Sequence, residues 1–197
     1  FTLIEDQTGD RVNQRLSSFF SGPESIVRSN AVLIEQGRLD LGDAAAMERY
    51  FAKQLSLFPG VDSIGVVTEQ REWLMLVRYA PDALIIRRFG AATGYRLNRY
   101  RTDADGQEGE LIESRQNFDP HNDPPGNPWY PAARDAGPGV WRMAVSLAKG
   151  QDHPLLVSFY ALPFHDAQGA VQGVLVAAVA LTEIGQFLRN LNVSAHG

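Results

Sequence analysis

The period of the apolar residues changes near residue 60, and this change constrains the fold more than any other feature of the sequence. Before it, apolar residues recur at helical spacing; after it, short apolar runs are separated by turn residues, as in strands. Helices followed by a run of strands predict an α+β domain with one central antiparallel sheet. We therefore expect two helices in residues 1–60 and a sheet module in residues 61–197, within one structural domain.

The first 60 residues predict two helices. Residues 8–36 form a long helix that Gly37 ends, because glycine is favoured just after a helix. Gly22-Pro23 interrupts this stretch, and we expect the proline to kink the helix or to restart it. Asp43 is a candidate N-cap for a second helix, which Pro59-Gly60 ends. The apolar residues of the first helix are Val12, Leu16, Phe19, Ile26 and Leu33. Those of the second helix are Met47, Tyr50, Phe51, Leu55 and Phe58.

The remaining chain predicts strands, loops and a short last helix. Residues 103–109 are a predicted polar turn, and residues 117–128, with four prolines, a predicted irregular loop of a length that is commonly functional. Residues 165–169 have the composition of a hairpin turn, and Thr182 can cap a terminal helix. The predicted strands are residues 61–68, 72–79, 83–89, 94–101, 140–147, 155–164 and 171–181. The terminal helix would bury Ile184, Phe187, Leu188 and Leu191.

Two adjacent large aromatics, Trp129 and Tyr130, stand between the two groups of strands. Pro128 and Pro131 flank them, fixing backbone angles and removing N–H donors. This pattern suits a short helix packed over a sheet as the lid of a pocket. The alternative is that both residues are ordinary core aromatics.

Composition excludes several classes of protein. The 197 residues suffice for one domain with a substantial core, and no stretch approaches the roughly 18 apolar residues of a membrane helix, which indicates a soluble chain. A net charge of −5 argues against a nucleic-acid binder, and the absence of cysteine excludes disulfides and thiolate chemistry. Because the chain opens at Phe1 without a methionine or a signal peptide, we expect a fragment of a longer protein.

Arginine is concentrated in the first group of strands. Eight arginines and no lysine fall between residues 71 and 115. One or two of them could point inward and bind a carboxylate or phosphate, whereas most could equally form a solvated outer face. Arg87 and Arg88 are adjacent, so in a regular strand they point to opposite faces, and one of them then needs a partner.

The sequence predicts no catalytic residue, no metal site and no cofactor. Only Asp119 and His121 pair a carboxylate with a histidine at close spacing, and a metal would need a third ligand. Ser158, His165 and Asp166 are the residue types of nucleophilic catalysis, but no Gly-x-Ser-x-Gly motif surrounds the serine. Phosphate-binding glycine loops are also absent.

An ordered set of motifs resembles the membrane-distal module of double Cache sensor domains. The motifs are residues 117–120, Pro128-Trp129-Tyr130 with Ala132-Ala133, Trp141, Leu162-Pro163 and residues 173–175. The resemblance implies a PAS-like sheet on the outer, periplasmic side of the cytoplasmic membrane. Transmembrane segments outside this chain would anchor it, and it would report ligand occupancy to a cytoplasmic kinase, cyclase or methyl-accepting output. A second module would follow the terminal helix.

The resemblance leaves two functions open. The first is a sensor of a small neutral or anionic molecule, and the second is a ligand-free dimerisation module, with an enzyme a distant third. In either case the first helix would mediate a homodimer, as in relatives. A cavity with convergent polar groups beneath Trp129 and Tyr130 would favour sensing. The predicted ligand-binding residues are Trp129, Tyr130, Arg78, Tyr79, Arg87, Tyr95 and Asn127.

The ligand class is constrained by residues that differ from amino-acid-binding relatives. Those relatives resemble one another in an arginine, a tyrosine and two aspartates that hold the α-carboxylate and α-ammonium. At the corresponding positions this chain has Asn127, Val145, Leu147 and Ala178. Because a buried ammonium without carboxylates is very costly, the resemblance implies that free amino acids do not bind in the family manner.

Overall fold

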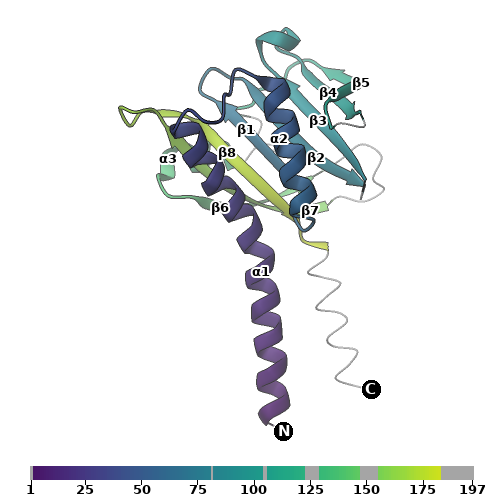
Figure 1. Ribbon diagram of the computed structural model, residues 1–197, viewed down its shortest axis with the longest axis vertical. Coiled ribbons are helices and arrows are strands. Elements are labelled where there is room, and N and C mark those ends of the chain that lie inside the picture. The colour runs from purple at the N-terminus through teal and green to yellow at the C-terminus, as the bar shows by residue number, and fades with distance from the viewer. Residues whose placement is uncertain (1, 81, 104–105, 123–128, 147–154, 183–197) are drawn as a thin grey trace.

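The computed structural model describes residues 2–80, 82–103, 106–122, 129–146 and 155–182. In these ranges the chain forms three α-helices, one 3₁₀ turn and a single eight-stranded antiparallel sheet (Figure 1). The helices are α1 (Thr2–Glu35), α2 (Ala44–Leu57) and α3 (Trp129–Ala136). The strands are β1 (Ser63–Thr68), β2 (Trp73–Ala80), β3 (Ala83–Phe89), β4 (Leu97–Thr102), β5 (Glu108–Arg115), β6 (Val140–Ser146), β7 (Leu155–His165) and β8 (Val171–Ala180). The predicted α+β class is confirmed.

Helix α1 is longer than predicted and is continuous. It contains Pro23 in its interior, so of the two predicted outcomes, a kink or a restart, the restart does not occur. Ile26 and Val27, which follow the proline, are buried against the sheet and hold the helix in place. The helix ends where predicted: Gly37 has φ 66°, and its N–H donates to the carbonyl of Ile34 at 2.9 Å. The first half of α1 extends beyond the sheet (Figure 1).

Helix α2 follows the predicted pattern. The Asp43 carboxylate accepts a hydrogen bond from the N–H of Ala46 at 2.9 Å and so caps the first turn. Met47, Phe51 and Leu55 are buried, while Phe58 lies just past the helix and is 38% exposed. The helix therefore covers the sheet with one apolar stripe.

The strand order β5-β4-β3-β2-β1-β8-β7-β6 joins two meanders at the centre of the sheet, where β1 pairs with β8. All predicted strands are present, and the predicted hairpin at residues 165–169 connects β7 to β8. Two details differ. Strand β4 begins at Leu97 rather than residue 94, because the 3₁₀ turn Ala91–Thr93 is followed by Gly94 and Tyr95, which both have positive φ. Strand β5 was not predicted, because its residues are mostly exposed and lack alternation.

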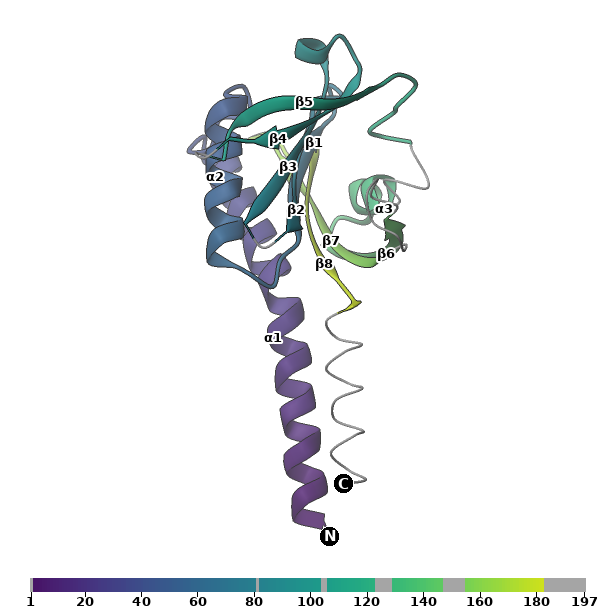
Figure 2. The same cartoon turned by 90° about the vertical axis from the view of Figure 1, so that its right-hand side faces the viewer.

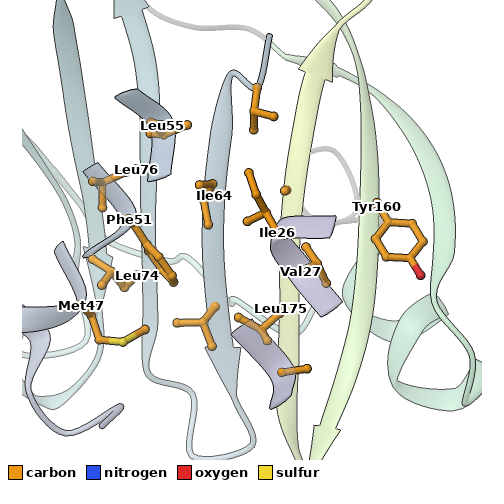
Figure 3. Packing of buried hydrophobic residues seen from close by; sticks show 14 of the residues in the cluster. Ile26, Val27, Met47, Phe51, Leu55, Ile64, Leu74, Leu76, Tyr160 and Leu175 are labelled. Carbon is orange, nitrogen blue, oxygen red and sulfur yellow. The ribbon is translucent and has the colours of Figure 1, made fainter. Parts of the chain in front are cut away.

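The two faces of the sheet carry separate cores. Helices α1 and α2 cover one face, called here the helix face, with residues such as Phe51 and Leu76 packed between them and the strands (Figure 3). Helix α3 lies on the other face, called here the α3 face (Figure 2). The predicted terminal helix lies outside the described residues.

Candidate functional site

Helix α3 covers only part of its face. It contacts β6, β7 and β8, on the side of the sheet opposite α1 and α2 (Figure 2). Trp129 is 0% exposed and packs near Phe159, with ring centroids 6.4 Å apart. Tyr130 is buried beside it. The predicted helix over the sheet is thus present, and its two aromatics are buried core residues of the α3 face.

A polar cluster ties α3 to the turn between β1 and β2. The hydroxyl of Tyr130 donates to Glu69 Oε1 at 2.5 Å, and Arg134 donates to both oxygens of Glu69 at 3.0 Å. The bonds from Arg134 lower the pKa of Glu69, whereas burial, and then the hydrogen bond to Glu69, raise the pKa of Tyr130. The ring of His121 stacks on Tyr130 at 4.3 Å, and its Nε2 lies 2.8 Å from the carbonyl of Thr68. The β1–β2 turn therefore fixes α3 and its preceding loop together.

The described part of that loop places an aromatic side chain on the sheet. Phe118 stacks on Trp73 with centroids 4.9 Å apart and meets Phe89 edge-on at 5.3 Å. The guanidinium of Arg115 lies over the Phe118 ring, 5.4 Å from its centroid. These rings form an aromatic wall (Trp73, Phe89 and Phe118) on the α3 face of β2 and β3.

A row of charged side chains crosses the sheet beside this wall. In register, Met75 of β2 pairs with Arg87 of β3, Arg87 with Arg99 of β4, and Arg99 with Glu113 of β5. Met75 belongs to the α3-face core, so alternation puts Arg87 and its partners on this face. Arg99 donates to Glu113 at 2.7 Å. Burial, followed by repulsion from Arg99, lowers the pKa of Arg87 to about 10.

Among the described residues, Arg88 Nε and the Tyr160 hydroxyl on the helix face have no hydrogen-bond partner, and neither do several buried donors on the α3 face. Those on the α3 face are Trp73 Nε1, Arg87 Nε, Arg99 Nε and Trp129 Nε1. All four groups can donate and none can accept. A face that holds unpaired donors suits a ligand rich in acceptor atoms.

The structure brings together some of the predicted ligand-binding residues. Trp129, Tyr130 and Arg87 lie on the α3 face, whereas Arg78 lies on the helix face and donates to the carbonyl of Leu55 at 2.6 Å. Tyr79 is 47% exposed. Tyr95 is 57% exposed, with its ring 5.9 Å from that of Phe89 at the margin of the aromatic wall, and Asn127 lies outside the described residues.

Sequence reasoning did not select Trp73, Arg99, Glu113 or Phe118. Arg99 was one of eight arginines, and only the register of β3 against β4 identifies it as the neighbour of Arg87. A signal was present for Phe118, since it opens the predicted functional loop.

The described residues do not assemble a metal or catalytic centre. No group of three His, Asp or Glu side chains that could hold a metal ion is found among them. Ser158 is buried near one end of β7, and His165 is at the other end, so the candidate nucleophile and base are apart. None of the helices in the described ranges is both long and apolar enough to cross a membrane.

No protein-family model and no curated protein sequence matches the chain. Among solved structures, it is similar to the ligand-binding domain of the amino acid chemoreceptor PctC of Pseudomonas aeruginosa PAO1, in complex with GABA. The two chains are 17% identical with a TM-score of 0.59, and the match covers 98% of this chain and 66% of that one. It is also similar to the extracellular domain of soHK1S-Z6, named as a histidine kinase, with 15% identity, TM-score 0.56, and coverage of 94% and 64%.

A third similar structure is a methyl-accepting chemotaxis protein X, with 17% identity, TM-score 0.54, and coverage of 92% of this chain and 62% of that one. The chain thus spans slightly less than two thirds of each of these structures. The resemblance predicted from sequence motifs is confirmed at the level of the fold. This chain has the PAS-like α+β fold of Cache-type sensory domains.

Proposed function

We propose that this chain is the extracytoplasmic ligand-sensing domain of a transmembrane bacterial signal-transduction protein. Two of the similar structures named above are the ligand-binding domain of a chemoreceptor, in complex with GABA, and the extracellular domain of a histidine kinase. This chain spans only part of the length of the similar structures, which leaves room for a second module. The partial coverage supports the membrane-distal position in a double Cache domain. A sensory role also requires no catalytic group in the domain itself.

The ligand would bind on the α3 face, between α3 and the strands β2 to β5. The observation that carries this proposal is Arg87, a buried guanidinium on that face that forms no ion pair within the described ranges and whose Nε is a donor without a partner there. Trp129 and Tyr130 would form one border, and Arg87 would lie in the floor. Arg78 is not part of this site, because it lies on the helix face.

The ligand would be a neutral or anionic molecule rather than a free amino acid. On the α3 face of β6 stand Val140, Arg142 and Ala144, whereas Val145 pairs with Leu156 on the helix face. Neither β6 nor β8 contains a tyrosine or an aspartate, so these strands offer no carboxylate for an α-ammonium group. Ala178, in particular, is fully buried in the core.

Thermal-shift screening of the purified chain tests the sensing function. We expect saturable stabilisation by a neutral or anionic metabolite, worth about 2.7 kcal/mol at 100 times Kd. The twenty common amino acids and GABA form the comparison set, and calorimetry verifies each hit. Saturable binding of an L-amino acid would contradict the proposed ligand class, and the absence of any binder would favour the ligand-free dimerisation module.

We further propose that α1 mediates a parallel homodimer in the tethered full-length protein. Its first half extends beyond the sheet (Figure 1), and a groove lined by Phe19, Leu57 and Phe58 lies where it meets the end of α2. Because the chain has no cysteine, single cysteines placed along residues 8–20 report proximity without background from the chain itself. We expect crosslinks at helical spacing along α1 and none at a control cysteine replacing the exposed Ala167 in the turn between β7 and β8. Failure to crosslink at every α1 position would contradict the dimer.

A further inference from the structure

We propose that Arg87, Arg99 and Arg115 form a binding site for a small oxyanion, a carboxylate or phosphate group, on the α3 face. This inference rests on the proposed sensing function and names the chemistry of its ligand. Arg87 and Arg99 would form the floor, and Arg115, over the Phe118 ring, would form one side. The planar guanidinium group matches both carboxylate and phosphate oxygens through paired hydrogen bonds.

Charge on this patch is not balanced. Across β3, β4 and β5 the row holds two arginines, Arg87 and Arg99, and one glutamate, Glu113, which already pairs with Arg99 at 2.7 Å. In the described ranges Arg87 forms no ion pair, and its Nε is a buried donor without a partner. A partly buried cation beside another is costly to maintain unless an anion joins it. The patch therefore has one positive group in excess that a ligand can neutralise.

Arg88, the next residue of β3, is an arginine with a structural role and serves as a comparison for Arg87. Arg88 lies on the helix face and binds two carboxylates, Glu48 of α2 and Glu108 of β5, the second at 2.7 Å. Arg87 faces the other way at the same level of the sheet, and no carboxylate of the described residues pairs with it. A structural role accounts for Arg88 and leaves Arg87 without one.

The surroundings favour a compact ligand in a site with little water. The aromatic wall bounds the patch at one end, and Met75 adjoins Arg87 in the floor. Apolar side walls strengthen the attraction between a guanidinium and an anion, because they exclude water from the pair. A zwitterion is less suited, since Glu113, the acidic side chain in this row, is occupied by Arg99.

The test uses succinate, citrate and inorganic phosphate as probes, with succinamide as the neutral counterpart of succinate. Melting curves and calorimetry at constant ionic strength compare the parent with Arg87→Met, Arg87→Lys and Arg101→Met. Arg101 is the control, because it lies on the neighbouring strand, is largely exposed and pairs with the exposed Glu110. Comparing the affinity for phosphate with the affinities for succinate and citrate shows whether the site prefers a phosphate or a carboxylate.

We expect at least one anion to stabilise the parent saturably and succinamide to have no effect. Arg87→Met should weaken binding at least about tenfold, Arg87→Lys should weaken it less, and Arg101→Met should leave it unchanged. Without ligand, Arg87→Met should melt at or above the parent temperature, which shows that lost binding is not lost folding. No saturable binding of any probe anion, or binding retained in Arg87→Met, overturns this site. A neutral metabolite that binds parent and Arg87→Met equally overturns the oxyanion site while supporting the sensing function.

Discussion

Glu69, in the turn between β1 and β2, attaches α3 to the centre of the sheet. It accepts hydrogen bonds from the hydroxyl of Tyr130 and from Nε and Nη2 of Arg134, and these bonds stabilise its charged form. Because its pKa is lowered on folding, the stability that it contributes is present above its unfolded value and is lost as the pH falls through the folded value. The attachment of α3 is thus a source of acid sensitivity.

Glu69→Gln should lower the free energy of unfolding at pH 7 by about 1 kcal/mol, a reduced value because Arg134 is nearly half exposed. The difference between this variant and the parent should shrink as the pH falls below about 4.5. Chemical denaturation at several pH values measures it. Glu110→Gln is the matched control, because the pair of Glu110 with Arg101 is largely exposed and should contribute little. A difference independent of pH would rule out the carboxylate as its source.

Trp129 and Trp141 lie on opposite faces of the sheet. Comparing a substitution at each position distinguishes an effect on stability from an effect on ligand binding. Trp129→Ala should cost roughly 3 to 5 kcal/mol, because the side chain is 0% exposed, and should also abolish ligand stabilisation. Trp141 packs against Phe20 and Tyr160 on the helix face, so Trp141→Ala should lose stability but retain binding. Urea denaturation and calorimetry measure the two effects. Retained binding in a folded Trp129→Ala variant would remove α3 from the proposed site.

At the scale of elements, a buried polar cluster joins α1 to α2. The Asn30 side chain, which is 0% exposed, exchanges two hydrogen bonds of 2.9 Å with Gln54, and Tyr50 donates to Asn30 at 3.1 Å. Each amide satisfies the other, so the cluster fixes the register of the two helices. Asn30 and Gln54 do not belong to the apolar stripes that predict α1 and α2, whereas Tyr50 belongs to the predicted stripe of α2.

Asn30→Ala should destabilise the chain by about 2 kcal/mol, because it leaves the Gln54 amide buried without its partner. Gln54→Ala should have a similar cost, and the double variant should cost clearly less than the sum of the two. Urea unfolding of all four proteins gives the coupling energy. Additive costs would mean that the two side chains act independently, in contradiction to the paired amides.

Sequence patterns predicted the elements that bury an apolar face and missed those that do not. The Asp43 cap, the end of α1 at Gly37 and the apolar runs of β7 and β8 follow local rules. Strand β5 is an exposed edge strand that is held by its pairing with β4, and local alternation does not encode it. The same applies to the site, because the approach of Arg87 to Arg99 depends on strand register rather than on sequence distance.

At the scale of the whole molecule, the hairpin β7–β8 lies between the proposed site and α1. Helix α3 contacts β7 and β8 on one face, and α1 packs on the same two strands on the other (Figure 2). Ala161 and Val176 lie on the α3 side of these strands, whereas Tyr160 and Leu175 lie on the α1 side. A shift of α3 on ligand binding can therefore reach α1 through two central strands.

Hydrogen exchange of the parent with and without a stabilising anion tests this connection. Exchange should slow in β3, β4 and α3, which adjoin the site, and should also change in residues 24–35 of α1, which pack on β7 and β8 on the face opposite α3. The Arg87→Met variant at the same anion concentration should show neither change, and it serves as the control for general salt effects. Slowed exchange confined to β3–β5 and α3 would mean that binding is local. In that case the signal would have to leave the domain by a route other than α1, since the coupling of two sites requires a shared element that responds to both.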